Sequence, residues 1–405
     1  MLLLNGTITD HSGSYQAHLR ITDEIISEIS PTLTPQENEE VLDCTGKDLL
    51  PALIDIGIYP KNKSLSSSTL SSLNAKCLQG GVGSVLLYGD LHPLCNDANT
   101  LELIGFINST LALNVFSSIH AFAPDGRIAD IASLKSCGAK ALHCKSQDLE
   151  GYNLLTLLNY AKMLNLPLIL MPHDAQLANG VIDAGSLGAQ MGLPSIPSIA
   201  WSKEVAKLGE ISRFFCTPML LTLADPKSID YVKFFNTQGA QLLLQTSIHH
   251  LALEESHIQN YNTKAKIFPP LKNKASREAL LQKICDGEID CITSLQNATY
   301  NSHKDQVFEL ASSGIDTINE YFSLLYTYLV RTKIITLAKL SAMTSYHQAK
   351  FLNLPCGELS VGKRADILVA DLEQSTICQD NYSPYFGQEL YGKINHFILK
   401  GKIYE

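Results

Sequence analysis

Short apolar segments alternate with amphipathic ones along most of this chain. Eight apolar segments are bounded by glycine, proline or polar residues, which is typical of strands buried on both faces of a parallel sheet. They are Ala52–Ile58, Val82–Tyr88, Leu113–Ile119, Ala139–His143, Leu168–Met171, Pro218–Thr222, Gln241–Gln245 and Ile289–Ser294. The pattern therefore predicts eight parallel strands.

Helical patterns separate these strands, and most of them end at a glycine or before a proline, which are helix stop signals. They are Ser64–Gln79, Asp125–Cys137, Leu149–Asn165, Pro226–Gln238, Ser276–Asp286 and a last helix over about Asp316–Thr332. The alternation predicts an α/β protein with a (β/α)8 barrel. A doubly wound open sheet is the main alternative, but it usually carries fewer strands.

The two ends of the chain have a different pattern from the middle. Residues 1–50 and 356–405 contain short strand-like segments punctuated by turns and glycines. We therefore expect a β-rich side domain built from both termini, next to a barrel formed by residues 51–355. Leu2–Leu4 and Ile394–Leu399 are predicted to be adjacent strands of this small sheet.

Composition excludes several classes of protein. The chain has 405 residues, of which 45% are apolar and 18% charged, and its net charge is −9. No basic run stands out, which argues against a nucleic-acid or membrane-surface role, and no apolar stretch reaches the length of a membrane span. Ten scattered cysteines without a C-x-x-C pair indicate reduced thiols in a cytoplasmic protein, not a disulfide frame or a zinc cluster.

Barrel enzymes carry their chemistry at the carboxyl ends of the strands. Among the eight predicted strand ends, only the fourth and fifth offer metal-ligating side chains, namely His143, Cys144, His173 and Asp174. A metal-assisted hydrolase needs several such ligands converging on one ion. The other strand ends are a poor inventory for hydrolysis.

Five stretches, in order along the chain, carry a family resemblance. They are Pro51–Asp55 (PALID), Gln79–Ser84 (QGGVGS), Lys266–Ile292 (from KIFPPLK to DGEIDCI), Gly357–Asp366 and Ser383–Lys393. Together they resemble the dihydroorotases, the amidohydrolase-superfamily enzymes that close carbamoyl aspartate to dihydroorotate. The resemblance implies a TIM-type barrel of the amidohydrolase kind with a small side domain.

The same resemblance shows which functional positions have changed. Family metal ligands fall at Gly57, Tyr59, Met171 and Thr222, and the catalytic aspartate falls at Leu295. Leucine can neither ligate a cation nor move a proton. Active relatives use zinc, but here the ligands are missing, so we expect no metal cofactor and no catalytic residue.

Positions that hold substrate in the family have changed as well. The arginine that grips the substrate carboxylate becomes Lys61, and the asparagine after the second strand becomes Asp90. The carboxylated lysine of the fourth strand falls at Cys144 or Lys145, and an ungapped comparison leaves both open. A vestigial ligand-binding pocket is predicted around Lys61, Asp90, Lys145 and His173.

These changes predict a non-catalytic, dihydroorotase-like protein of pyrimidine biosynthesis. By resemblance to degenerate family members, its expected partner is aspartate carbamoyltransferase, which it would stabilise or organise; association into a homo-oligomer stays open. One alternative is an active cyclic-amide hydrolase with a metal site rebuilt from His143, Cys144, His173 and Asp174. Another is a metal-free protein that binds a small ligand in the old pocket.

Other histidines and one triad-like run are given structural roles. His249 and His250 fall where the family also has two histidines, and we expect them, like His120, to be hydrogen-bonded structural residues. Residues 10–12 (Asp-His-Ser) contain the residue types of a catalytic triad, but adjacency in sequence is not triad geometry. They are predicted to form a turn.

Overall fold

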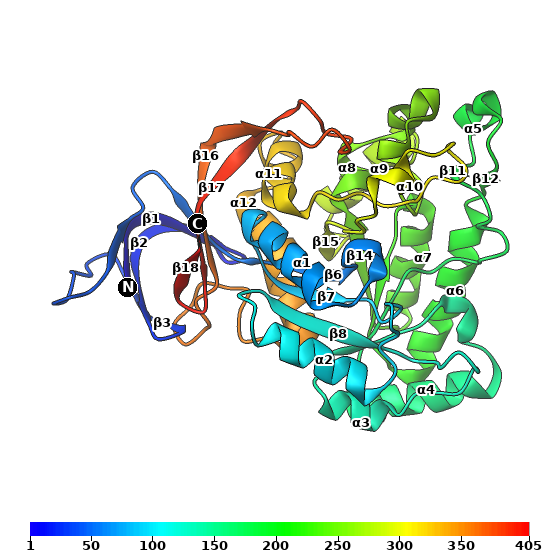
Figure 1. Ribbon diagram of the computed structural model, residues 1–405, viewed down its shortest axis with the longest axis horizontal. Coiled ribbons are helices and arrows are strands. Elements are labelled where there is room, and N and C mark those ends of the chain that lie inside the picture. The colour runs from blue at the N-terminus through cyan, green and yellow to red at the C-terminus, as the bar shows by residue number, and fades with distance from the viewer. Residues whose placement is uncertain (405) are drawn as a thin grey trace.

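Two β-sheets dominate the structure, which is a computed structural model that describes residues 1–404 (Figure 1). One sheet is a parallel barrel surrounded by helices, and the other is a mostly antiparallel sheet at one side of it. Across residues 1–404, no helix has the length and apolar character needed to cross a bilayer.

The barrel contains eight parallel strands in sequential order. Its strands are β6 (Leu53–Ile58), β7 (Val82–Leu87), β8 (Asn114–His120), β9 (Ala141–His143), β10 (Leu168–Leu170), β13 (Met219–Thr222), β14 (Leu242–Ser247) and β15 (Cys291–Thr293). A parallel bridge between Tyr59 and Asn297 joins the first strand to the last and nearly closes the sheet. All eight predicted strands are thus confirmed.

Helices cover the outside of the barrel. They are α1 (Ser67–Gln79), α2 (Ala98–Asn108), α3 (Ile131–Ser136), α4 (Gly151–Leu164), α6 (Ile199–Phe215), α7 (Pro226–Thr237) and α9 (Lys274–Cys285). Shorter elements decorate the loops: α5 (Ser186–Met191), α8 (Ile248–Ala252), α10 (Asn301–Lys304) and the pair β11 (Ile182–Asp183) and β12 (Ser195–Ile196). The predicted pattern of helices between strands is confirmed, and α2 and α6 are additional to it.

The segment after the last strand is helical in short pieces. It consists of α11 (Tyr321–Leu325), a π-helical turn (Tyr326–Val330), α12 (Leu337–Ser341), a second π-helical turn (Ala342–Tyr346) and α13 (His347–Leu352). The helix predicted over about residues 316–332 is confirmed, because residues 318–330 are continuously helical, and its second half has π-helical geometry. Ala349 and Leu352 of α13 join the cluster of side chains inside the barrel, so α13 closes the end at which the strands begin.

Both termini meet in the second sheet, as predicted. Its strands are β1 (Leu2–Asp10), β2 (Gly13–Thr22), β3 (Ile25–Ser30), β4 (Val41–Asp43), β5 (Asp48–Pro51), β16 (Ile367–Ile377), β17 (Glu389–Leu399) and β18 (Lys402–Tyr404). The order is β18-β17-β16-β5-β1-β2-β3, with β4 also paired to β1. The prediction that Leu2–Leu4 and Ile394–Leu399 are adjacent is wrong, because β5 and β16 lie between β1 and β17.

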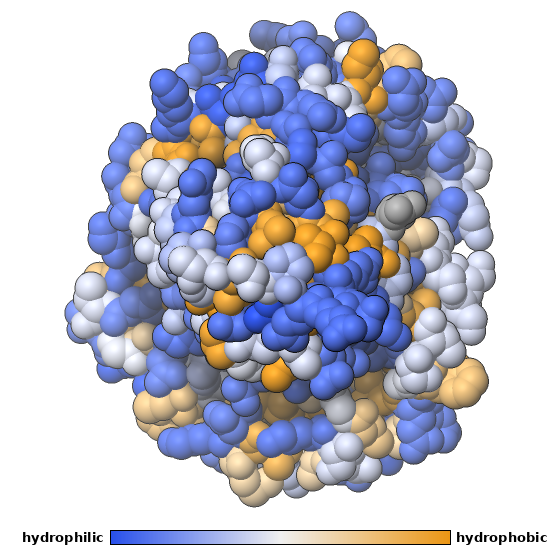
Figure 2. Space-filling view, turned by 90° about the vertical axis from the view of Figure 1, so that its left-hand side faces the viewer, coloured by the Kyte–Doolittle hydropathy of each residue, from blue (hydrophilic) through white to orange (hydrophobic). Residues whose placement is uncertain are grey.

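Each sheet has its own core. Leu3, Ile8, Leu19, Ile367 and Ile398 pack in a separate cluster inside the terminal sheet, away from the barrel's core. Figure 2, which faces this side of the molecule, shows a mainly hydrophilic surface with a compact apolar group near its centre. The terminal sheet is thus stabilised by its own buried side chains, and the surface on this side of the molecule is mainly polar.

Candidate functional site

A cavity of about 320 Å³ opens at the carboxyl ends of the barrel strands, where barrel enzymes bind substrate. Strands β6, β7, β9 and β10 and the loops after them supply most of its wall. The lining residues are Tyr59, Lys63, Tyr88, Asp90, His143, Cys144, Lys145, Met171, His173, Ile267, Phe268, Leu295 and Asn297. We refer to this space as the mouth cavity.

The Tyr88 ring occupies the space beside Gly57, the first of the expected ligand positions. Gly57 has φ +77°, and a Cβ added to it would lie 2.7 Å from both Cζ and Oη of Tyr88. No side chain at position 57 fits while the Tyr88 ring is there. Burial raises the pKa of the Tyr88 hydroxyl to about 12, so this group is neutral at pH 7.

A buried hydrogen-bond network holds the Tyr88 ring in place. The Tyr88 hydroxyl lies 3.2 Å from Oγ1 of Thr222, another of the expected ligand positions. Nε2 of Gln245 donates to the same Thr222 oxygen at 3.1 Å and to the Ile56 carbonyl at 2.9 Å. Thr222 is therefore committed to protein partners and does not face an open metal site.

The carboxylate of Asp55 has a structural role within the barrel wall. It is fully buried and accepts hydrogen bonds from the Thr293 hydroxyl at 2.5 Å and from the backbone and hydroxyl of Ser294. Burial raises its pKa to about 6, although these hydrogen bonds act in the opposite direction. The group ties β6 to β15 and does not line the mouth cavity.

Asp90 is the centre of a polar cluster on one wall of the mouth cavity. It accepts hydrogen bonds from the Tyr59 hydroxyl and from Nζ of Lys63, each at 2.7 Å, and Lys63 Nζ also lies 4.0 Å from the centre of the Tyr59 ring. Burial alone would raise the pKa of Asp90, but His143, Lys63 and Tyr59 together lower it. Tyr59, the second expected ligand position, is thus a hydrogen-bond donor.

Two histidines also line the mouth cavity. Burial lowers the pKa of His143 to about 4, against the opposing effect of Asp90, so the ring is neutral at pH 7 and Lys63 is the cation that holds Asp90 ionised. Nδ1 of His143 lies 3.7 Å from Asp90 and has no hydrogen-bond partner among residues 1–404. His173 donates from Nδ1 to the Met171 carbonyl at 2.9 Å, and burial lowers its pKa as well.

Of the four residues predicted to line a vestigial pocket, the structure brings three together. Asp90, Lys145 and His173 all line the mouth cavity. Lys61 lies outside it, exposed, with Nζ 5.0 Å from the centre of the Tyr300 ring. Lys63, which sequence reasoning missed, supplies the cation instead, because positive φ angles at Asn62 and Lys63 turn the chain back toward Asp90.

The alternative ligand set does not converge. Asp174 forms an ion pair with Lys203 and accepts hydrogen bonds from the amides of residues 176 and 177, and it does not line the mouth cavity. Cys144 is buried, and burial raises the pKa of its thiol. Among residues 1–404, no three His, Cys, Asp or Glu side chains come close enough to hold a metal ion.

Histidines outside the mouth cavity divide into two kinds. His249 bonds to the hydroxyls of Tyr385 and Thr317, and His250 bonds to Ser247 and the Pro269 carbonyl, as expected of structural residues. His120 differs from the expectation, because its Nδ1 is buried without a partner within residues 1–404. It lines a neighbouring hollow of about 550 Å³ that shares Lys63, Asp90 and Lys145 with the mouth cavity.

The triad-like run forms a turn. Asp10 accepts hydrogen bonds from the backbone and hydroxyl of Ser12, and the His11 ring stacks on Tyr346 at 3.7 Å. The three side chains therefore do not form a nucleophilic relay.

The side chains at the expected ligand positions are of the wrong kind for a zinc ion. Zinc prefers imidazole, thiolate and carboxylate ligands. The expected positions carry Gly57, Tyr59, Met171, Thr222 and Leu295, which do not fit that ion. What remains is a small cavity with one ionised carboxylate, two cations and two histidines.

Comparisons with known proteins agree on the family of this fold. A model described as the amidohydrolase family matches residues 254–404. A probable dihydroorotase-like protein of Helicobacter pylori (strain ATCC 700392 / 26695) is 31% identical over 403 residues, covering 99% of this chain and 97% of that protein. The dihydroorotase of Clostridioides difficile (strain 630) is 26% identical over 423 residues, covering 100% and 99%.

Solved structures show the same fold at low sequence identity. The L-hydantoinase (dihydropyrimidinase) from Arthrobacter aurescens superposes with a TM-score of 0.89 at 14% identity, over 99% of this chain and 95% of that one. Dihydropyrimidinase from Brevibacillus agri NCHU1002 gives a TM-score of 0.83 at 18% identity, over 99% and 94%. The barrel with its sheet of both termini is therefore the architecture of these proteins.

Proposed function

Because this chain belongs to the dihydroorotase-like proteins of the amidohydrolase superfamily, we propose that it is a non-catalytic member that acts as a structural or regulatory partner of aspartate carbamoyltransferase. The observation that carries the proposal is the Tyr88 ring beside Gly57. A ring in that place, hydrogen-bonded to Thr222, fills space that a ligand side chain would need. Fold alone does not imply activity, which depends on the residues of the site.

The changes at the mouth support one another. Gly57 has lost its side chain, Tyr88 fills the space, and Thr222 accepts a hydrogen bond within the protein. Leu295 and Met171 add apolar surface to the same cavity. Together, these replacements favour a site whose metal-binding space is now filled by side chains. The barrel and the terminal sheet around it still have the fold of the relatives.

A kept fold with a packed site is consistent with a role in assembly. The test is to measure molar mass by size exclusion with light scattering, for the chain alone and mixed with aspartate carbamoyltransferase of the same organism. We expect one peak of summed mass and an altered transferase activity. Two independent peaks over a wide concentration range would rule out the partnership.

Catalysis is tested separately. Purified protein is expected to contain no stoichiometric zinc and to show no hydrolysis of dihydroorotate at high protein concentration. Stoichiometric zinc, with turnover that is lost in His173→Ala, would instead establish an active hydrolase with a rebuilt site. These two measurements do not depend on whether the transferase binds.

A second candidate function is binding of a small molecule in the mouth cavity without turnover. The buried, unpartnered Nδ1 of His143 favours it, because buried polar atoms normally have a partner and a ligand would supply one. Dihydroorotate, carbamoyl aspartate and hydantoin are suitable probes in a thermal-shift assay. Stabilisation that disappears in His143→Phe would support this function, and no shift with any probe would remove it.

A further inference from the structure

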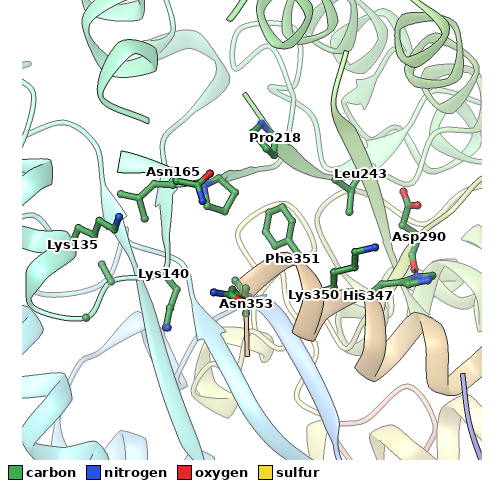
Figure 3. A pocket seen from close by; sticks show the side chains of 15 residues that line it. Lys135, Lys140, Asn165, Pro218, Leu243, Asp290, His347, Lys350, Phe351 and Asn353 are labelled. Atoms are coloured by element: carbon green, nitrogen blue, oxygen red, sulfur yellow. Dashed lines mark hydrogen bonds between the residues drawn. The ribbon is translucent and has the colours of Figure 1, made fainter. Parts of the chain in front are cut away.

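A second and larger hollow lies at the opposite end of the barrel, where the strands begin. Its volume is about 960 Å³, three times that of the mouth cavity. Helix α13 forms one wall, and the loops that lead into β9, β10, β13 and β15 form the others. Figure 3 shows the side chains that project into it. We refer to this space as the basal hollow.

Lysines stand on two sides of the basal hollow. Lys135 and Lys140 come from the segment before β9, and Lys350 comes from α13. Neither Lys140 nor Lys350 forms an ion pair with any of residues 1–404, and Lys135 Nζ donates only to the Leu164 carbonyl. Lys140 lies 5.5 Å from the centre of the Phe116 ring. These cations lack anionic partners within the described chain.

Asp290 is the one carboxylate that lines the basal hollow, and it bonds to the backbone and not to the lysines. Its Oδ2 accepts a hydrogen bond from the Leu244 amide at 2.7 Å, and its backbone carbonyl accepts one from Nδ1 of His347 at 2.7 Å. Figure 3 places Asp290 and His347 with Lys350 on one side of the Phe351 ring. Lys135 and Lys140 lie on the other side, away from this carboxylate.

The half-buried Phe351 ring and two amides complete the lining. The ring projects into the middle of the basal hollow, between the two groups of charged residues. Asn165 and Asn353 lie on the same side as Lys135 and Lys140, and neither side chain forms a hydrogen bond within residues 1–404. Asn165 and Asn353 end helices α4 and α13 as C-terminal caps, and both have left-handed backbone conformations with φ of 51° and 52°. Free amides beside an aromatic face are the groups that bind the edge and the plane of a heterocyclic base.

We propose that the basal hollow binds a nucleoside phosphate. Lys135 and Lys140 hold the phosphate, the base lies against Phe351, and the amides of Asn165 and Asn353 bond to polar groups of the ligand. Lysine binds phosphate as a point charge, and an aromatic side chain stacks on any base. The proposal does not depend on the role of the mouth cavity, which opens at the other end of the barrel.

Calorimetric titration of the full chain tests this site with three probes: UMP, AMP and sodium pyrophosphate. We expect a nucleotide to bind with one site per chain and to weaken as salt is added. Lys140→Met should weaken nucleotide and pyrophosphate by about tenfold or more, the loss of one charge-assisted bond. The matched control is Lys227→Met on α7, an exposed lysine without an ion pair that does not line the basal hollow.

Phe351→Leu separates recognition of the base from recognition of the phosphate. It should weaken UMP or AMP several-fold and leave pyrophosphate unchanged. If pyrophosphate and nucleotides bind alike and Phe351→Leu changes neither, the site takes phosphate alone and the nucleoside assignment is wrong. If no probe gives heat at millimolar concentration, or Lys227→Met weakens binding as much as Lys140→Met, the proposal fails. Unchanged melting temperatures of the variants show that each one folds.

Discussion

Gly57→Ala puts the packing of the mouth directly to the test. In the folded chain, the new Cβ would lie 2.7 Å from Cζ and Oη of Tyr88 and 3.0 Å from its Cε2. Carbon atoms in contact normally sit about 3.5–4.0 Å apart, so the ring must move. The backbone also disfavours a side chain, because φ is +77° at this position.

The cost has two parts that a second mutation separates. A left-handed conformation costs an L residue about 1–2 kcal/mol, and overpacking a filled interior costs about 1–3 kcal/mol. Gly57→Ala alone should therefore destabilise the fold by about 2–5 kcal/mol. In a Tyr88→Ala background the ring is gone, so only the backbone part should remain. We expect a coupling free energy of about 1–3 kcal/mol between the two sites.

Urea unfolding measures this coupling, and the chain supplies its own probe. Trp201 is the only tryptophan, is 1% exposed and lies 5.4 Å from Phe268, so its fluorescence reports the loss of the barrel. Gly105→Ala is the matched control, because a Cβ there meets nothing within 4 Å and an alanine in α2 should stabilise the helix slightly. Equal costs of Gly57→Ala with and without Tyr88 would refute the packing argument on which the proposed loss of catalysis depends.

Three further predictions concern charge and metal. His249 has a folded-state pKa of about 3 and an unfolded one near 6.5, so only the unfolded chain gains this proton as the pH falls below 6.5. As the pH falls from about 6 to 4, the unfolding free energy of the wild type should therefore decrease by about 1.4 kcal/mol per pH unit relative to that of His249→Gln. Urea unfolding at several pH values measures this, and a difference that does not change with pH would contradict it. Lys272 is 2% exposed and pairs with Asp183 at 2.5 Å. Lys272→Met should lower the unfolding free energy by about 3–5 kcal/mol, because it leaves a buried carboxylate without its cation, and adding Asp183→Leu should restore most of this loss. A double variant as unstable as Lys272→Met alone would contradict this reasoning. A chelator should leave the melting temperature unchanged in a thermal-shift assay, whereas a drop that zinc reverses would reveal a structural metal.

The strands were predictable because each is buried on both faces. Segments such as Val82–Leu87 are buried at every position, and their short, largely apolar sequences between glycine or polar residues are typical of central parallel strands. The pairing of the terminal strands was not predictable in the same way. Leu2–Leu4 and Ile394–Leu399 are both apolar, but β5 and β16 lie between them, and strand order is a property of the whole sheet.

The chemistry of the mouth was only partly visible in the sequence. The changed ligand positions, such as Gly57, follow from comparing motifs, whereas the ring that fills the space comes from Tyr88, on the neighbouring strand. The family spacing selects Lys61, but the left-handed backbone at Asn62 and Lys63 brings Lys63 to Asp90 instead. Contacts of this kind depend on loop direction, which residue pattern does not encode.

The pairing of β5 with β16 has a consequence for synthesis of the protein. Strand β5 ends at Pro51, but its antiparallel neighbour spans Ile367–Ala370, so the two are joined only after more than three hundred residues have been added. Until then the nascent amino-terminal sheet carries an open edge, which is a site for pairing with other chains. The ribosome releases the barrel segment before this edge is closed. Molecular chaperones that shield exposed strands should therefore matter most during the interval between translation of β5 and translation of β16.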